Sequence, residues 1–213
     1  GPKGASAPGF CDPLIERVRR DDLSCGAPMY GVGEEDRLTA SLRRDHEVIL
    51  KALERLEERV AVWKGTGEVD RAALRRFIEF ARTFIDRCHH GKEERCLFPC
   101  LERRGIPREG GPIGVMLYEH QLGREMVARL DEGLRALERG DEGAVSAILS
   151  TCDEYIQLLR NHIAKENGVL FPMGESVAEE MDFAEVGGCY ERVEEVEIGR
   201  EVHEKLERSV EEL

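Results

Sequence analysis

Four long stretches of this chain repeat apolar residues at steps of three and four. That period places the apolar side chains along one face of an α-helix, so each stretch predicts a helix that packs in a core. The first runs from about residue 36 to the break Gly65-Thr66-Gly67, and the last ends near residue 173. The apolar members of the four seams are Leu38, Leu42, Ile49, Leu53, Leu56, Val60 and Trp63, then Leu74, Ile78, Ala81 and Ile85, then Met116, Leu117, Val127, Leu130, Leu134 and Leu137, and finally Ile148, Cys152, Tyr155, Leu159 and Val169.

Short connections between these stretches predict the topology. Asp70 can cap the second helix, residues 105–112 are rich in Pro and Gly, and Gly140-Asp141 is a short turn. Helices joined in this way pack against their neighbours in alternating directions. The predicted fold is all-α, an antiparallel up-down-up-down four-helix bundle with an extra helical C-terminal extension.

The chain divides into three expected segments. These are an N-terminal extension (1–34) with a short helix near 13–20, the bundle (35–173), and an acidic C-terminal helical extension (174–213). In the last segment Gly187-Gly188 predicts a break before a helix near 191–212. One stripe of that helix is apolar, which fits docking on the bundle, on a protein partner or in a homodimer. The stripe consists of Val202, Leu206 and Val210.

Composition narrows the class of protein. The net charge of the 213 residues is −13, of which residues 174–213 carry −10 from four basic and fourteen acidic residues. The bundle has no basic stripe, which argues against nucleic-acid binding. No apolar run approaches the ~18 residues of a membrane span. The seven cysteines form no C-x-x-C pair, and residues 1–9 lack the apolar core of a signal peptide. We therefore expect a cytoplasmic location and reduced thiols.

Polar side chains lie in phase with the apolar seams. Burying them without partners would cost several kcal/mol each, and metal ligation removes that cost. In H-x-x-x-E the two side chains lie one helical turn apart, and imidazole with carboxylate suits iron, manganese or zinc. The candidate ligands on the seams are His46, His89, Glu93, His120, His162 and Glu166.

An internal repeat indicates which of the polar residues are the primary metal ligands. HHGKEERCLFP at 89–99 matches HIAKENGVLFP at 162–172 with an offset of 73, and His46 matches His120 with an offset of 74. Two packed copies of such a helix hairpin would bring the six groups together midway along the bundle. His90 and Glu94 have Ile163 and Asn167 as counterparts, so His90 is kept as an optional seventh ligand.

At this point the sequence resembles a known family. The ordered segments RRDHEVIL, CHHGKEERCLFP, YEHQLGR and RNHIAKENGVLFP, spanning roughly 38–173, are similar to those of the hemerythrin HHE cation-binding family. The resemblance implies two iron ions, Fe²⁺ or Fe³⁺, with an oxo or hydroxo bridge allowed and Mn or Zn as substitutes. By that match Glu93 and Glu166 bridge the ions, and the terminal ligands are His46, His89, His120 and His162.

The chain departs from the oxygen-carrying members of that family on the third helix. They have H-x-x-x-H there, whereas this chain has Arg124 in the second position. They also commonly carry an Asp one residue beyond the position of Glu166. His90, Tyr118, Glu119 or water could take the missing place. The difference argues against reversible oxygen carriage and leaves room for redox chemistry at an open metal position.

The expected function is that of a non-haem di-iron protein that binds or reacts with O₂ or a related small oxidant, in oxygen or redox sensing, storage or scavenging. The alternative is a di-iron enzyme acting on peroxide, nitric oxide or Fe(II), and structural zinc is a further possibility, so whether the chain is an enzyme stays open.

Among the residues near the candidate ligands, we expect Lys92 and Lys165 on outer faces, His203 on the surface, and Phe98 and Phe171 in the core.

Overall fold

The computed structural model describes residues 38–213, and these residues form helices and no strand. The expected helix near 13–20 lies outside the described residues. The bundle elements are α1 (Ala40–Thr66), α2 (Arg71–Phe80), η2 (Ala81–His90), η3 (Glu93–Leu97), α3 (Phe98–Arg103), α4 (Pro112–Glu138), α5 (Ala144–Lys165), η4 (Glu166–Leu170) and α6 (Phe171–Val177). The extension comprises α7 (Glu180–Val193), η5 (Glu194–Ile198), α8 (Arg200–Ser209) and η6 (Val210–Glu212).

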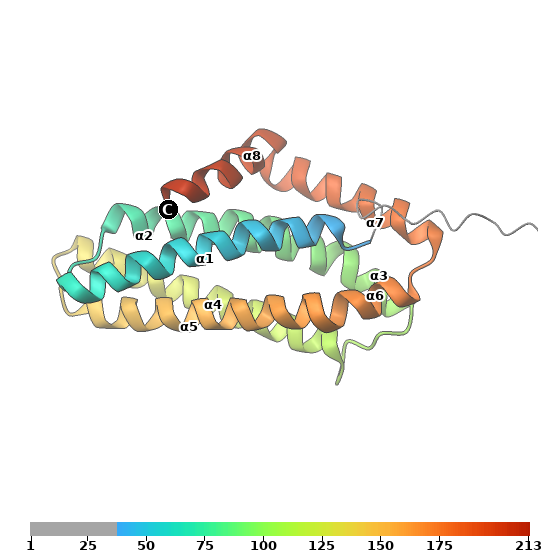
Figure 1. Ribbon diagram of the computed structural model, residues 1–213, viewed down its shortest axis with the longest axis horizontal. Helices are drawn as coiled ribbons and strands as arrows, with labels where there is room; N and C mark the ends of the chain where they lie inside the picture. The colour runs from blue at the N-terminus through green and yellow to red at the C-terminus, as the bar shows by residue number, and fades with distance from the viewer. Residues whose placement is uncertain (1–37) are drawn as a thin grey trace, which may run out of the picture. The chain divides into compact units, whose positions relative to one another are not determined.

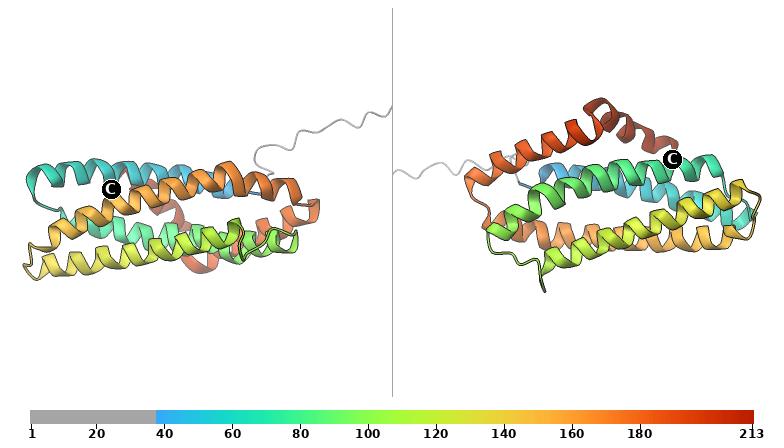
Figure 2. Two further views of the ribbon diagram at one scale, coloured as in Figure 1. Left: turned by 90° about the horizontal axis from the view of Figure 1, so that it is seen from below. Right: turned by 180° about the vertical axis from the view of Figure 1, so that it is seen from behind.

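The four long arms of the bundle run antiparallel (Figures 1 and 2), which confirms the predicted all-α class. The second arm is continuous from α2 to α3, and the fourth from α5 to α6. Asp70 caps α2 by accepting hydrogen bonds from the backbone N–H groups of Ala72 and Ala73, each at 3.0 Å. Gly67 ends α1 with φ of +76°, a left-handed conformation that favours glycine.

Two apolar clusters fill the bundle, one on each side of the predicted metal ligands. The larger contains Leu53, Phe84 and Tyr155. The smaller contains Phe98 and Phe171, which confirms both as core residues. Along every arm the polar seam residues fall between the two clusters. A polar layer in that position is closed off from water at both ends by packed side chains.

The π-helical turns η3 and η4 begin at Glu93 and Glu166. A π turn adds one residue, so the buried face shifts by one position. Val169, predicted to lie in the fourth seam, is therefore 53% exposed, whereas Leu170 is buried. The prediction for Val169 is wrong because it assumed an unbroken α-helical period.

The C-terminal extension folds back onto its own bundle. α7 and α8 lie along the bundle surface in Figure 1. Val210 and Leu213 are buried in the larger apolar cluster. The predicted break at Gly187-Gly188 is wrong, because both residues lie inside α7, and the interruption falls instead at Gly199, where φ is +82°.

One pair of cysteines ties this extension to the second arm. Cys96 on η3 and Cys189 on α7 form a disulfide across a sequence separation of 93 residues. The expectation of reduced thiols is wrong for this pair, since the packing of α7 against η3 brings together cysteines that are remote in sequence. Cys88, Cys100 and Cys152 are buried free thiols.

Opening this disulfide is expected to lower the free energy of unfolding by about 2–4 kcal/mol, because the cross-link restricts the unfolded chain. Urea unfolding of the wild type and of Cys189→Ala, each with and without dithiothreitol, measures the change. The reductant should lower the midpoint of the wild type and leave that of Cys189→Ala unchanged. Equal responses of the two proteins would contradict the prediction.

No helix within residues 38–213 combines the length and the apolar character that crossing a membrane requires.

Candidate metal centre

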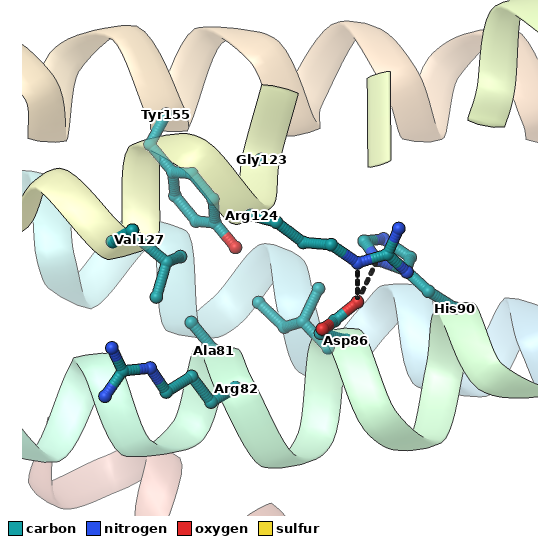
Figure 3. Close-up of a pocket in the computed structure, with 10 residues that line it drawn as sticks. Ala81, Arg82, Asp86, His90, Gly123, Arg124, Val127 and Tyr155 are labelled. Carbon is teal, nitrogen blue, oxygen red and sulfur yellow. Dashed lines mark hydrogen bonds and ion pairs between the residues drawn. The ribbon is translucent and has the colours of Figure 1, made fainter. Parts of the chain in front are cut away.

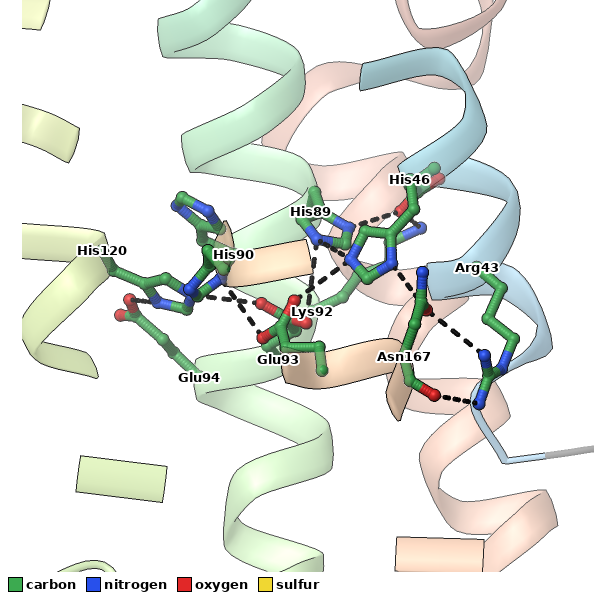
Figure 4. A network of polar contacts seen from close by, with 12 residues as sticks. Arg43, His46, His89, His90, Lys92, Glu93, Glu94, His120 and Asn167 are labelled. Atoms are coloured by element: carbon green, nitrogen blue, oxygen red, sulfur yellow. Dashed lines mark hydrogen bonds and ion pairs between the residues drawn. The ribbon is translucent and has the colours of Figure 1, made fainter. Parts of the chain in front are cut away.

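Two pairs of histidines face each other at the middle of the bundle (Figure 4). His46 of α1 and His89 of η2 form one pair, with their Nε2 atoms 3.1 Å apart. His120 of α4 and His162 of α5 form the other, with their Nε2 atoms 3.2 Å apart. Each arm of the bundle therefore supplies one imidazole, and all four rings are buried.

Two glutamates lie between the pairs, and each contacts both of them. Glu93 places Oε1 3.7 Å from His89 Nε2 and Oε2 3.2 Å from His120 Nε2. Glu166 places Oε2 3.1 Å from His46 Nε2 and Oε1 3.2 Å from His162 Nε2. The six predicted side chains thus come together with an approximate twofold symmetry, and each carboxylate spans the two halves.

The glutamate oxygens provide the test of whether metal ions fit here. Glu93 and Glu166 are fully buried, and none of their four oxygens accepts a hydrogen bond. Carboxylates buried in this state are costly unless cations balance them. Together with imidazole nitrogens, these oxygens form two sets of donors that could each hold an ion, and one set includes His90. Within each set the ligand atoms lie within 4.8 Å of one another. The residues fit a pair of divalent or trivalent metals, while their individual roles as ligands remain a prediction.

The outer nitrogen of every histidine in the two pairs has an oxygen partner. These contacts run from His89 Nδ1 to Asp45 (3.1 Å), His162 Nδ1 to Glu119 (2.9 Å), His46 Nδ1 to Asn167 (3.0 Å) and His120 Nδ1 to Glu94 (2.8 Å). An acceptor at Nδ1 holds the proton on that atom and leaves the Nε2 lone pair directed inward, as metal binding requires. The chain itself therefore prepares the four rings as donors.

Sequence reasoning missed these outer partners, although the repeat contains their signal. Asp45 and Glu119 both precede a seam histidine, and Glu94 and Asn167 both follow a seam glutamate. To find the partners of the histidines, one should look for positions with an oxygen acceptor in both copies of the repeat, even where the two residues differ.

Lys92 is fully buried, so its expected place on an outer face is wrong. Its ammonium lies 2.6 Å from Asp45 and 2.9 Å from Glu194, and it donates to Ser41 at 3.1 Å. Burial raises the pKa of Asp45, but Lys92 and His89 outweigh this effect and hold it at about 2. Lys165, its counterpart in the repeat, pairs with Glu119 and is 42% exposed.

The charges of the buried glutamates also change the pKa values of the histidines. Burial lowers the pKa of His162, but the charge of Glu166 and the hydrogen bond to Glu119 outweigh burial and raise it to about 10. The neighbouring imidazoles in turn hold the pKa of Glu166 well below its usual value, against the effect of burial.

His90 lies beside the second pair, with its ring stacked on that of His120 at 3.7 Å between centroids. Its Nδ1 has no hydrogen-bond partner, and burial lowers its pKa well below the usual value, so the ring is neutral. Arg124 donates to Asp86 and to Glu94, each at 2.7 Å, instead of facing the centre. Tyr118 is 65% exposed, and Glu119 holds His162 from outside, so His90 is the described residue best placed for the missing position.

A cavity of about 260 Å³ opens next to His90 (Figure 3). Its wall combines apolar side chains with the ion pair between Arg124 and Asp86. A small molecule would reach the centre from the side of His90.

His90→Ala is expected to lower the affinity for one of the two metal ions by at least about tenfold. Tenfold is the lower end of the loss that mutations around a metal ligand cause. Stepwise titration of the metal-free protein with Fe²⁺ under nitrogen measures both affinities. The control is Tyr118→Ala, which changes an exposed neighbour of the centre. Two unchanged affinities in His90→Ala would exclude it as a ligand.

Comparison with known proteins agrees with this geometry. Residues 29–174 match the model of the hemerythrin HHE cation binding domain. Since the match covers more than half of the chain, the chain belongs to this family of cation-binding helical bundles. No solved structure matches the chain.

Among curated proteins, an uncharacterized protein of Mycobacterium tuberculosis is 26% identical over 158 residues, covering 74% of this chain and 61% of the relative. The iron-sulfur cluster repair protein YtfE of Salmonella typhimurium is 36% identical over 87 residues, 39% of each chain. The iron-sulfur cluster repair protein DnrN of Neisseria gonorrhoeae is 36% identical over 86 residues, 39% of this chain and 54% of the relative. The chain spans about three fifths of the length of the first of these relatives.

Proposed function

We propose that this chain is a non-haem di-iron protein that binds or reacts with O₂ or a related small oxidant. The observation that carries the proposal is the set of four glutamate oxygens, buried between two histidine pairs and free of hydrogen bonds. In this assignment His46 and His89 hold one ion, and His120 and His162 hold the other with His90. Glu93 and Glu166 would contribute to holding both ions, since each carboxylate contacts both histidine pairs. When bound, an iron pair supplies electrons for the reduction of a small oxidant.

The surrounding residues prepare this reaction. The four oxygen partners at Nδ1 fix the ring orientations, and the stacked rings of Phe171 on His46 and Phe98 on His120 exclude water from one end. The cavity beside His90 admits a small molecule, and Arg124 places a cation at its wall. Because the second pair has the extra imidazole of His90 and lies beside this cavity, the proposal assigns substrate binding to that half.

The test is iron loading under nitrogen followed by exposure to air. We expect about two irons per chain and a new visible absorption band in air. A band that fades on deoxygenation indicates reversible binding, whereas decay to a stable ferric state indicates a redox role. Zinc retention with no spectral change would exclude chemistry with O₂.

The names of two relatives favour a second candidate, which is repair of iron-sulfur clusters. In this reading the centre reacts with nitric oxide or peroxide or releases iron. Incubating the iron-loaded protein with a damaged cluster protein, and following recovery of its cluster spectrum, separates repair from oxidant binding. The metal-free protein is the control.

A cytoplasmic location stays a prediction, and the disulfide Cys96–Cys189 is the observation against it, since such bonds are rare in reducing compartments. Nucleic acid and membrane remain unexpected partners, because the bundle sequence has no basic stripe and no apolar run of about 18 residues. The docking of the extension on its own bundle leaves a homodimer through this segment as a proposal to be tested by light scattering.

A further inference from the structure

A second group of metal-binding side chains lies where the C-terminal extension meets η2. Cys88 of η2, Glu194 of η5 and His203 of α8 each offer one ligand atom, and these three atoms lie within 4.8 Å of one another. We propose that these three residues form a separate site for a single Zn²⁺ ion. The inference does not depend on the proposed function of the central pair.

The surroundings of His203 are the main evidence for a zinc ion at this place. Only 13% of its side chain is exposed, which corrects the expected surface position, and its buried Nε2 has no hydrogen-bond partner. On the opposite side of the ring, Nδ1 lies 3.6 Å from Glu207, and the ring packs on Phe84 with centroids 5.0 Å apart. A carboxylate behind the ring and an open nitrogen in front of it are the usual arrangement of a zinc-bound histidine.

The local charge favours a dication. Lys92 lies 2.9 Å from Glu194, but its ammonium is already matched by Asp45 at 2.6 Å. Glu194 and Glu207 then leave an excess of negative charge around His203. Asp45 Oδ1 lies 3.9 Å from His203 Nε2 and offers an oxygen as a fourth ligand close to the group.

The donor types identify the ion. A thiol, an imidazole and a carboxylate form the mixed set that suits zinc, and binding at the thiol displaces its proton. The central pair contains no sulfur among its candidate ligands. The two sites therefore differ in chemistry as well as in place, and a zinc ion here would fasten the extension to η2.

Cobalt titration of the metal-free full chain under nitrogen tests the proposal, because Co²⁺ bound by a thiolate gives a near-ultraviolet charge-transfer band. We expect one equivalent of Co²⁺ per chain to produce this band and Zn²⁺ to bleach it by displacement. A background with Cys11→Ser and Cys25→Ser restricts the free thiols to the described ones. His120→Ala with His162→Ala should reduce central binding and leave the band intact, which separates the two sites.

Two variants remove the proposed ligands. Cys88→Ser should abolish the band, and His203→Ala, which changes a partly exposed residue and keeps the thiol, should weaken cobalt binding by at least about tenfold. Cys152→Ser, a buried cysteine of α5, is the matched control and should keep both band and affinity. Circular dichroism verifies that each variant is folded. A folded wild type without the band, or a band that survives Cys88→Ser or keeps its affinity in His203→Ala, would overturn the proposal.

Discussion

The double variant Glu93→Gln, Glu166→Gln is expected to lose binding of the metal pair and, with it, the stabilisation that metal provides. At a metal concentration a thousand times the dissociation constant, a ligand of the folded state contributes about 4.1 kcal/mol. For a chain of this size that corresponds to a rise in Tm of about 8–16 °C. The variant should show no rise, because amide oxygens carry no charge to balance two cations.

Thermal unfolding with and without Fe²⁺ under nitrogen measures this effect, and elemental analysis gives the metal content. The matched control is Glu54→Gln with Glu79→Gln, which removes two exposed carboxylates from the first and second helical arms. The control should keep both the metal and the rise in Tm. Retention of about two ions by the central double variant would refute the assignment of the carboxylates.

Lys92→Met is expected to destabilise the metal-free protein by about 3–5 kcal/mol, because it leaves the carboxylate of Asp45 buried without its ammonium partner. Lys165→Met, at the equivalent position of the repeat, should cost less than about 1 kcal/mol because that lysine is largely solvated. Urea unfolding of the three metal-free proteins gives the comparison. The contrast between two lysines in the same motif isolates the effect of burial.

Adding Asp45→Asn to Lys92→Met completes the test as a double-mutant cycle. Removing the orphaned charge should restore part of the lost stability. Equal losses for the two lysine variants, or a double variant less stable than the sum of the single changes, would show that the Lys92–Asp45 pair is not the cause.

Much of the fold could be predicted from the sequence, because the spacing of apolar residues along each helix shows which face is buried. Burial of that face is the dominant stabilising force. The six central residues could be predicted for the same reason. His46 or Glu166 in phase with leucines must face inward, and the repeat then places both copies at one level. The outer partners, such as Asp45, could not be predicted with equal force, because a polar residue beside the seam is satisfied by water as readily as by a histidine.

The four helices, their antiparallel order and the polar layer follow from the amino-acid sequence, since these depend on spacing along single helices. The remaining features depend on how the helices pack against one another. This packing buried Lys92, joined Cys96 to Cys189 and brought His203 to Cys88, because each of these contacts links segments whose separation along the chain carries no periodic signal. Packing also moved the buried position from Val169 to Leu170, since the π turn that begins at Glu166 adds one residue to the helical period.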